Sequence, residues 1–382
     1  MTYSPAQRQQ PAARRHGGKA DNVGGQPSAA EGTAPQTTTR EGSQAQRPGL
    51  LLAMAADTAE RLFDDRHRAR LGALARTDPY LVADELAEPA PAVADALARA
   101  EILLTGWGAP ALTGRVLAAA PRLRAVVHAA GSVKHHLTEA CWERGIAVAS
   151  AADANALPVA EYTLAAILLA NKRVLHSAHR YRELRGRPHD WHAELGRAGN
   201  YRRTVGVIGA SRTGRRVIAL LRPFDLRVLL YDPYVDAAEA GRLGVRAVAL
   251  DELCAASDIV TVHAPQLPAT RHLLGARELA LMPDGATLVN TARGSLVDGT
   301  ALLAELRTGR LHAVLDVTEP ELPPPGSPLY DLPNVLLTPH IAGSMGGELH
   351  RLADAALDEV ERYVNGVPFA GPVRAADLGH SA

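Results

Sequence analysis

One stretch, Thr204 to Asp232, constrains the fold of this chain more than any other. It begins with a β-branched apolar run over residues 205–208, which suits a strand covered on both faces of a parallel sheet. Gly209 permits the tight turn that ends this strand, and Gly214 lets a following helix pack closely on it. A helix that begins there directs unpaired backbone N–H groups and the positive end of its dipole at the turn. The stretch therefore predicts a strand, a turn and a helix that together bind a diphosphate.

The end of the next strand, over residues 226–231, indicates which dinucleotide is bound. Asp232 follows this strand, eighteen residues after Gly214. A carboxylate in this place accepts hydrogen bonds from both hydroxyls of an adenosine ribose and repels a 2′-phosphate, which favours NAD over NADP. The alternative is that Asp232 only caps the end of the strand. The glycine pattern departs from the usual one at Ser211, whose Cβ narrows the approach of the backbone to the pyrophosphate and whose hydroxyl is able to donate a hydrogen bond in return.

Composition and charge exclude several classes of protein. The chain has 382 residues, which is enough for two domains with cores of their own, and 47% of them are hydrophobic. Its 41 basic and 41 acidic residues cancel, so there is no electrostatic reason to expect nucleic acid as a partner. Cys141 and Cys254 have no metal-ligand spacing and are expected to be reduced thiols. Because no apolar run is long enough to cross a bilayer and no signal sequence opens the chain, we expect a cytoplasmic protein without membrane contact.

The alternation of apolar strands with helices predicts two α/β domains. Strands at residues 50–54, 101–104 and 124–127, with a helix over residues 92–100 behind Pro91, predict a small open α/β domain. A doubly wound parallel sheet is predicted from helices at residues 237–243, 250–255 and 299–308 between strands at residues 204–208, 226–231, 245–248, 258–263, 286–290, 312–317 and 335–338. A helix over residues 157–172 has Pro158 in its first turn, and a last helix over residues 344–364 has Ser344 as its N-cap. The polar residues 1–47 are expected to be a disordered tail.

Ionisable side chains follow three strands of the doubly wound sheet. Arg293 follows one strand, Glu319 and Glu321 follow the next, and His340 follows the last. Because the carboxyl ends of parallel strands meet at one edge of a sheet, these side chains are expected to converge on one crevice. An arginine there binds a substrate carboxylate, and a histidine oriented by a glutamate moves the proton of an adjacent hydroxyl. The set predicts oxidation of an alcohol beside a carboxylate, with the hydride passing to a nicotinamide.

Over residues 50–370 the chain resembles the D-isomer-specific 2-hydroxyacid dehydrogenase family. The motifs that carry the resemblance are, in chain order, Gly209-Ala210-Ser211-Arg212-Thr213-Gly214 with Asp232, Asn290-Thr291-Ala292-Arg293-Gly294-Ser295-Leu296-Val297-Asp298, Asp316-Val317 with Glu321, and Thr338-Pro339-His340-Ile341-Ala342-Gly343. The resemblance implies a Rossmann-type doubly wound parallel sheet that binds NAD and a smaller flavodoxin-like α/β domain that binds the substrate. It places the substrate-binding domain at residues 48–133 and 343–370, the NAD-binding domain at residues 134–342 and a C-terminal tail at residues 371–382.

The resemblance also implies the roles of individual residues. Catalysis falls to Arg293, Glu321 and His340, with Glu319 as the alternative to Glu321, and no metal is implied. The residues implied to bind the cofactor are Gly209, Ser211, Arg212, Thr213, Gly214, Asp232, His263, Pro265, Thr291, Ala292, Asp316 and Gly343. Those implied to bind the substrate are Gly131 and Ser132, together with Arg293. The turn of Gly131 and Ser132 either presents backbone N–H groups to an anion or only connects a strand to a helix. It departs from the family pattern at Val133, where a second glycine is usual, and at His135, where an aspartate is usual.

The expected function is that of an NAD(H)-dependent oxidoreductase acting on a small D-2-hydroxy acid or its 2-keto partner. Glyoxylate or hydroxypyruvate reductase and phosphoglycerate dehydrogenase are the candidate activities, and the end of the sequence at residue 382 disfavours the longer forms of the latter. The alternative from another class is a catalytically weak regulatory protein that senses NAD, like the corepressors built on this fold, which Ser211, Val133 and the tail favour. Family members are usually homodimers joined through their cofactor domains, and the polar residues 176–201 suit a dimer arm.

Overall fold

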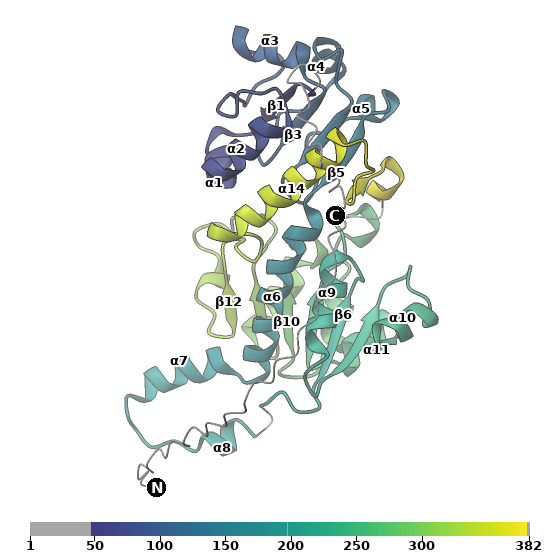
Figure 1. The fold of residues 1–382 in the computed structure, drawn as a ribbon. Helices are drawn as coiled ribbons and strands as arrows, with labels where there is room; N and C mark the ends of the chain where they lie inside the picture. Colours follow the sequence, from purple (N-terminus) through teal and green to yellow (C-terminus); the bar gives the residue numbers. More distant parts are fainter. Residues whose placement is uncertain (1–46, 197, 380–382) are drawn as a thin grey trace, which may run out of the picture. The chain divides into compact units, whose positions relative to one another are not determined.

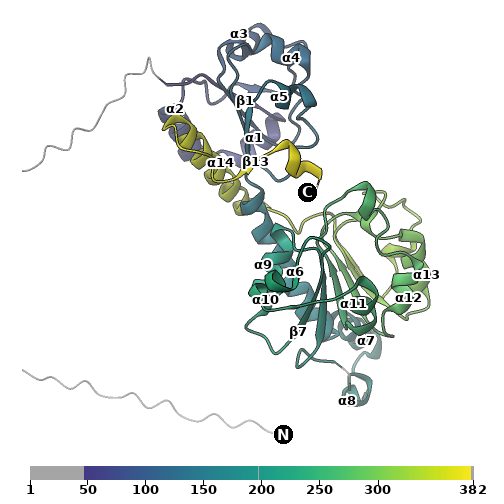
Figure 2. The same ribbon diagram turned by 90° about the vertical axis from the view of Figure 1, so that its right-hand side faces the viewer.

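The computed structural model describes residues 47–196 and 198–379, so the predicted disorder of the tail falls outside the described residues except at Arg47. Two β-sheets organise this part of the chain, and each carries helices on both faces (Figures 1 and 2). The first sheet has the order β2 (Val82–Ala83), β1 (Leu50–Ala53), β3 (Ile102–Thr105), β4 (Ala125–His128), β5 (Ala147–Ser150) and β13 (Pro372–Val373). The second has the order β12 (Val335–Leu337), β11 (His312–Leu315), β10 (Thr287–Asn290), β9 (Ile259–Val262), β6 (Thr204–Ile208), β7 (Arg227–Tyr231) and β8 (Arg246–Ala247).

The first sheet confirms the expected flavodoxin-like arrangement. Strands β1 to β5 pair in parallel in the order β2-β1-β3-β4-β5, which is the flavodoxin order, and β13 adds to β5 in the antiparallel direction. Alternate residues of β1 face opposite cores. Leu50 and Leu52 pack beneath α1 (Ala56–Leu62), α2 (Asp65–Leu74) and α14 (Leu349–Val364). Leu51 and Ala53 pack beneath α3 (Pro91–Arg99), α4 (Gly114–Ala119) and α5 (Glu139–Glu143).

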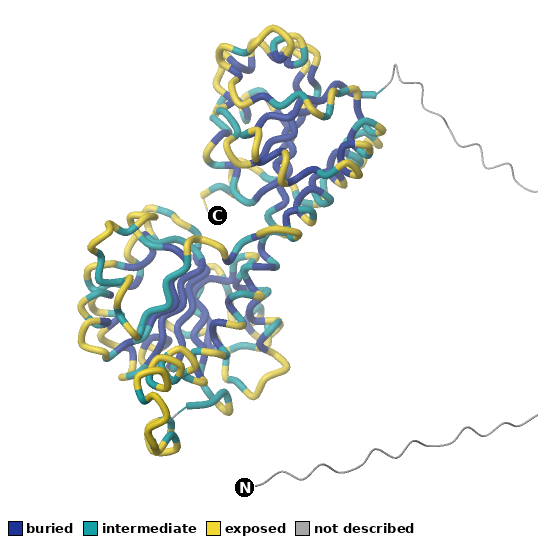
Figure 3. Tube along the Cα trace, turned by 90° about the vertical axis from the view of Figure 1, so that its left-hand side faces the viewer, coloured by how far each residue is buried: buried dark blue, intermediate teal, exposed yellow. Residues whose placement is uncertain are grey.

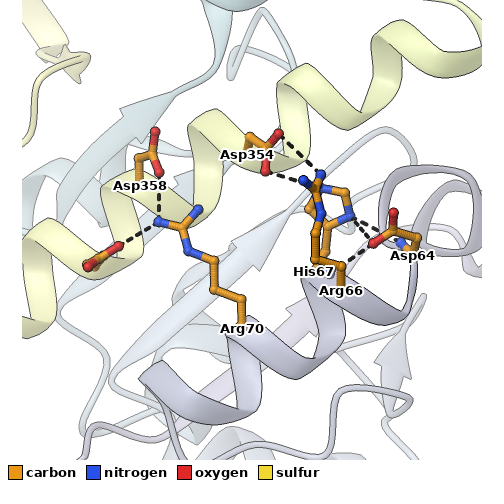
Figure 4. Close-up of polar contacts among 7 residues, drawn as sticks. Asp64, Arg66, His67, Arg70, Asp354 and Asp358 are labelled. Carbon is orange, nitrogen blue, oxygen red and sulfur yellow. Dashed lines mark hydrogen bonds and ion pairs between the residues drawn. The ribbon is translucent and has the colours of Figure 1, made fainter.

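Helix α14 packs against α2 through an apolar face and a line of ion pairs along its edge (Figure 4). Arg70 of α2 reaches Asp358 at 2.7 Å and Glu361 at 2.5 Å on α14. The buried His67 lies between Asp64, which caps α2, and Asp354 of α14. Because exposed ion pairs contribute little, the buried leucines and alanines of α14 supply most of the stabilisation, and the ion pairs fix which faces meet.

The second sheet confirms the Rossmann-type doubly wound arrangement. All its strands are parallel, and the chain order reverses between β6 and β9, which is where ligands bind in sheets of this kind. Helices α6 (Ala152–Asn171), α9 (Arg212–Leu221) and α10 (Ala237–Leu243) lie on one face, and α11 (Leu250–Ala256), α12 (Ala276–Leu281) and α13 (Gly299–Arg307) lie on the other (Figure 2). The central strands are therefore buried on both sides (Figure 3), as their β-branched sequences predict.

The expected boundary between residues 133 and 134 is wrong. Strand β5 pairs with β4 along its whole length, so the residues up to Ser150 belong to the first sheet. The expected C-terminal tail is also wrong over its described part, because Pro372 and Val373 pair with β5 and a 3-10 helix, η6 (Ala375–Gly379), follows. A short strand beside a buried one has too few residues to give a periodic signal in the sequence.

Two predicted helix starts are also wrong. Helix α6 begins at Ala152, which leaves Pro158 inside the helix instead of in its first turn. Burial of the apolar faces of α6 outweighs the hydrogen bond that the proline ring cannot donate. Helix α14 begins at Leu349 behind a 3-10 turn, η5 (Gly346–Glu348), so Ser344 is not its N-cap. Glu348 holds the N-cap position of α14 without a side-chain cap hydrogen bond, and its carboxylate instead accepts a hydrogen bond from the N–H of Met345 at the start of η5.

Two helices, α7 (Val174–Leu184) and α8 (Trp191–Glu194), form the segment that was expected to be a dimer arm (Figure 1). No residue of either helix is buried. Among the described residues, no helix is long and apolar enough to cross a membrane. Cys141 and Cys254 are buried free thiols, as expected.

Candidate active site

A cavity of about 300 Å³ lies at the carboxyl edge of the second sheet. It is lined by ten residues that the sequence singled out, namely Gly131, Ser132, Ser211, Arg212, Thr213, His263, Pro265, Thr291, Ala292 and Arg293. These come from the loops after β4, β6, β9 and β10. The carboxyl ends of β6, β9 and β10 bring their loops together at one edge of the second sheet, and the loop after β4 of the first sheet completes the lining.

The turn after β6 has the backbone that a diphosphate-binding site needs. Gly209 has φ +95°, and a Cβ on it would lie 2.6 Å from the backbone nitrogen of Ala264. A Cβ on Gly214 would lie 2.0 Å from the carbonyl oxygen of Gly209, so α9 can approach β6 only with glycine there. Ser211 is the N-cap of α9, and its hydroxyl accepts a hydrogen bond from the Gly214 N–H at 3.2 Å. The serine that departs from the glycine pattern thus begins the helix, and its hydroxyl hydrogen is still available as a donor.

Asp232 lies at the end of β7 beside this turn. Its carboxylate accepts hydrogen bonds from the N–H of Ala210 at 2.7 Å and of Tyr234 at 2.8 Å. The carboxylate therefore accepts hydrogen bonds from two backbone N–H groups, and each of its oxygens has a further lone pair that can accept a hydrogen bond from a ribose hydroxyl. Both interpretations of Asp232 from the sequence are compatible with this geometry.

His263 lies beneath the cavity and is fully enclosed. Its Nε2 lies 2.9 Å from the hydroxyl of Thr261, and its Nδ1 has no hydrogen-bond partner among the described residues. Burial lowers the pKa of His263 to about 3, so the ring is neutral at physiological pH. A buried ring nitrogen without a partner beside a cavity is a place where a ligand can supply the missing hydrogen bond.

Arg293 is the cation that follows β10. Its guanidinium donates a hydrogen bond to the carbonyl oxygen of Ala292 at 2.6 Å and lines the cavity. Burial lowers the pKa of Arg293, and the negative charge of Glu321 opposes that shift. Arg293 therefore faces both the cavity and the carboxylate of Glu321.

His340 and Glu321 form a pair, with 2.6 Å between Nδ1 of the histidine and Oε1 of the glutamate. Both side chains are about half exposed, and neither lines the described cavity wall. His340 has φ +54°, a backbone conformation that non-glycine residues rarely adopt. Glu319 instead binds Arg271 with two hydrogen bonds, of 2.7 and 3.0 Å, which lower the pKa of its carboxyl group. The geometry thus pairs Glu321, and not Glu319, with the histidine.

Asp316 holds the loop that carries His340. Its carboxylate is buried and accepts hydrogen bonds from the Thr338 hydroxyl at 2.6 Å and from the N–H groups of Ile341 at 2.9 Å and Ala342 at 2.8 Å. Both carboxylate oxygens of Asp316, which the family resemblance implies to contact nicotinamide, therefore accept hydrogen bonds from the loop that carries His340. It does not line the cavity, and neither does Gly343, which lies at the end of the same loop.

Asn155 is a site residue that the sequence analysis missed. Its side chain lines the cavity, and its Oδ1 accepts a hydrogen bond from the N–H of Ser344 at 3.2 Å. A Cβ on Gly131 or on Gly343 would lie 3.6 Å from its amide group. Asn155 thus contacts both the substrate loop and the histidine loop. An asparagine near the start of an apolar helix was the available signal, but the predicted helix began two residues too late to include it.

No group of three or more metal-ligating side chains occurs in the described part of the chain. The cavity offers glycines for close backbone approach, unpaired N–H groups at the start of α9 and a cationic wall. Such a site suits an anionic dinucleotide together with an anionic substrate.

Comparison with known proteins relates this chain to dehydrogenases and reductases of 2-hydroxy acids. Residues 164–342 match the family model described as D-isomer specific 2-hydroxyacid dehydrogenase, NAD binding domain. The chain is 33% identical over 270 residues to the D-3-phosphoglycerate dehydrogenase of Methanocaldococcus jannaschii, covering 70% of this chain and 50% of that protein. It is 34% identical over 263 residues to the glyoxylate reductase of Aeropyrum pernix, covering 67% of this chain and 78% of that protein.

A solved structure of a protein from Thermus thermophilus superimposes with a TM-score of 0.64 at 30% identity, covering 85% of this chain and 99% of that one. The chain spans about half the length of the phosphoglycerate dehydrogenases that it matches.

Proposed function

This chain belongs to the D-isomer-specific 2-hydroxyacid dehydrogenase family, and we propose that it is an NAD(H)-dependent oxidoreductase that interconverts a small D-2-hydroxy acid and its 2-keto acid. The observation that carries the proposal is the hydrogen bond between His340 and Glu321. Glu321 follows β11 and His340 follows the neighbouring β12, while Arg293 follows β10 on the other side of β11. A base, an acid that orients it and a cation that binds the carboxylate are the groups that this reaction requires.

The residues present fit the dinucleotide. Gly209 and Gly214 leave room that any side chain would fill, and α9 directs its first N–H groups at the turn. We assign the ribose hydroxyls to Asp232 and the diphosphate to the turn between Ser211 and Thr213. His263, with an unsatisfied Nδ1 beside the cavity, supplies a further contact.

Nε2 of His340 transfers the proton to and from the substrate. Glu321 accepts a hydrogen bond from Nδ1, which fixes the tautomer and leaves Nε2 to exchange a proton with the oxygen on C2 of the substrate. Arg293 binds the adjacent carboxylate with two parallel hydrogen bonds and so orients C2. When bound, the nicotinamide supplies or accepts the hydride at that carbon.

The test is NADH oxidation, followed by the absorbance of the cofactor, against a panel of 2-keto acids with NADPH in parallel. His340→Ala is expected to lower kcat by about 100-fold or more while NADH affinity is kept, because general acid–base catalysis contributes that much. His350→Ala, a histidine on α14 that does not line the cavity, is the matched control. Unchanged turnover in the His340 variant would refute the assignment.

The second candidate is a regulatory protein that binds NAD without turnover. Ser211 favours it, because a side chain at that position narrows the turn where other members of the fold place glycine. Tight NADH binding together with silence across the whole keto-acid panel would select this candidate over the enzyme.

We also propose that the protein is a cytoplasmic homodimer that uses α7 and α8. Helix α7 buries none of its residues, and Val174, Leu175 and Tyr181 expose 38%, 40% and 67% of their surface. Apolar side chains exposed together along one helix are typical of a subunit interface. Tyr181→Glu is expected to shift the protein to a monomer in sedimentation analysis, and an unchanged mass would refute this interface.

A further inference from the structure

The wall of the active-site cavity carries an excess of positive charge. Lys134, Arg212 and Arg293 line it, and its described lining contains no aspartate or glutamate. Arg212 lies in the first turn of α9 near Asp153, at 3.4 Å, where the proposed diphosphate binds. Lys134 and Arg293 are the two cations on the substrate side.

The loop after β4 holds Lys134 at the cavity. Val133 is 2% exposed and packs in the core of the first sheet, and His136 is 3% exposed. The Thr105 hydroxyl lies 2.9 Å from Nδ1 of His128 and 3.2 Å from Nε2 of His136, so both ends of the loop are tied to one side chain. Because the residues on either side of Lys134 and His135 point into the core, these two are left at the cavity wall.

The positive charge of Arg293 acts on Lys134. Burial lowers the pKa of the Lys134 ammonium group, and the positive charge of Arg293 lowers it further. One substrate carboxylate, bound in the fork of the Arg293 guanidinium, offers both of its oxygens to that residue. A second anion beside Lys134 would stabilise its ammonium form and offset the repulsion between the two cations.

The choice of lysine at this position is unusual for the chain. Only three of its 41 lysine and arginine residues are lysines, namely Lys19, Lys134 and Lys172. An ammonium group is a compact charge that binds one oxygen at a time, whereas a guanidinium requires two oxygens in a plane to use its fork. A lysine therefore suits the end of a short, flexible ligand.

We propose, building on the proposed function, that the substrate is a 2-hydroxy or 2-keto acid with a second anionic group. Arg293 binds the carboxylate beside C2, and Lys134 binds the distal anion, which is a carboxylate or a phosphate ester. Lys134 is thus a specificity-determining residue, and the loop anchored by Val133 and His136 is the element that positions it.

The experiment compares substrates that differ only in the distal group. 2-Oxobutanoate and oxaloacetate have the same carbon chain, with a methyl group in one replaced by a carboxylate in the other. 3-Phosphohydroxypyruvate forms the third arm and distinguishes a phosphate from a carboxylate. We expect kcat/KM for at least one dianionic substrate to exceed that for 2-oxobutanoate by tenfold or more, because a charge-assisted hydrogen bond contributes about that factor.

Three variants test whether Lys134 is responsible for the preference for dianionic substrates. Lys134→Met keeps the length of the side chain and is expected to lower the ratio of dianion to monoanion kcat/KM by about tenfold, mainly through KM. Lys134→Arg keeps the charge and most of the ratio. Lys172→Met, at the exposed end of α6, is the matched control and should leave the ratio unchanged. In the wild type, KM for the dianion is expected to rise as the pH passes through the lowered pKa of Lys134, whereas KM for 2-oxobutanoate should not follow it.

Each outcome decides something. Equal or better activity with 2-oxobutanoate overturns the inference and leaves the proposed function intact. A preference for dianions that survives in Lys134→Met overturns the role of the lysine. Failure to turn over any keto acid overturns the proposed function, and the inference falls with it. If the methionine variant does not fold, the substrate comparison with the wild-type protein still decides whether a second anion is preferred, and the pH dependence of KM tests the role of Lys134.

Discussion

Replacing Asp316 by asparagine is expected to weaken the loop that carries His340. The carboxylate is 1% exposed and accepts hydrogen bonds from three donors, two of which are backbone N–H groups at 2.9 and 2.8 Å. An amide of the same shape offers one acceptor oxygen, so its NH₂ group must face one of these donors. The lost charge-assisted bond costs about 1.5–3 kcal/mol, and the donor left unsatisfied costs about 1–3 kcal/mol more.

The cost is therefore between about 2.5 and 6 kcal/mol, a large share of the roughly 5–15 kcal/mol that stabilises a typical domain. We expect Asp316→Asn to lower the urea midpoint, measured by circular dichroism, and to lower kcat because His340 is no longer held in its left-handed conformation. Asp331→Asn, an exposed aspartate on the preceding loop, is the control. A variant with the stability and kcat of the wild type would refute the argument from the three hydrogen bonds.

The same variant separates two roles of Asp316. If the carboxylate acts mainly on nicotinamide, as the family resemblance implies, the dissociation constant of NADH should rise while the urea midpoint is kept. If it acts mainly on the histidine loop, stability and kcat should fall with little change in NADH affinity. The hydrogen bonds to Thr338, Ile341 and Ala342 favour the second result.

Further predictions concern the cofactor turn and the response to acid. Gly214→Ala places a Cβ 2.0 Å from a carbonyl oxygen and should weaken NADH binding at least tenfold by fluorescence titration, whereas Gly241→Ala, with open space around it on α10, should bind NADH normally. Asp232→Ala should reduce the preference for NADH over NADPH, measured as a ratio of kcat/KM, and an intact ratio would count against the ribose contact. Burial lowers the pKa of His136 from 6.5 to about 4, so as the pH falls the unfolded chain binds the proton before the folded chain does. The stability contributed by the neutral ring is therefore complete above pH 6.5 and is lost as the pH falls towards 4. The loss is about 2 kcal/mol at about pH 5; His136→Gln should flatten the dependence of the urea midpoint on pH, and a slope as steep as that of the wild type would contradict the assignment.

The second sheet could be predicted from the sequence because its signals are local. Each strand is an apolar run bounded by a turn, and the order of strands and helices leaves few topologies open. The proximity of Glu321 to His340 and to Arg293 followed from one rule about the carboxyl ends of parallel strands, although only Arg293 of the three lines the cavity. Helix α12 was absent from the prediction because six residues are too few to show a helical period.

What the sequence did not reveal depends on tertiary contacts. The start of α6 was placed too late because Pro158 is most often found in a first turn, and nothing local shows that packing holds the helix together on both sides of it. That one error removed Asn155 from consideration, although it contacts two loops of the site. The spacing to Asp316 favoured Glu321 over Glu319, but the physical reason required coordinates, because the two carboxylates have the same chemistry until Arg271 is seen to bind Glu319.

Val133 shows how a departure from a family pattern changes meaning when packing is known. In the sequence it is a lost glycine in the substrate loop, which suggests weaker backbone contact with a carboxylate. In the structure its side chain is an anchor in the core, and His136, tied to Thr105, is a second anchor three residues later. A loop fixed at two points loses little conformational entropy when a ligand binds, so its side chains can act as preorganised contacts. The turn is therefore anchored on both sides of Lys134, and under the proposed function specificity for a charged substrate is the expected consequence.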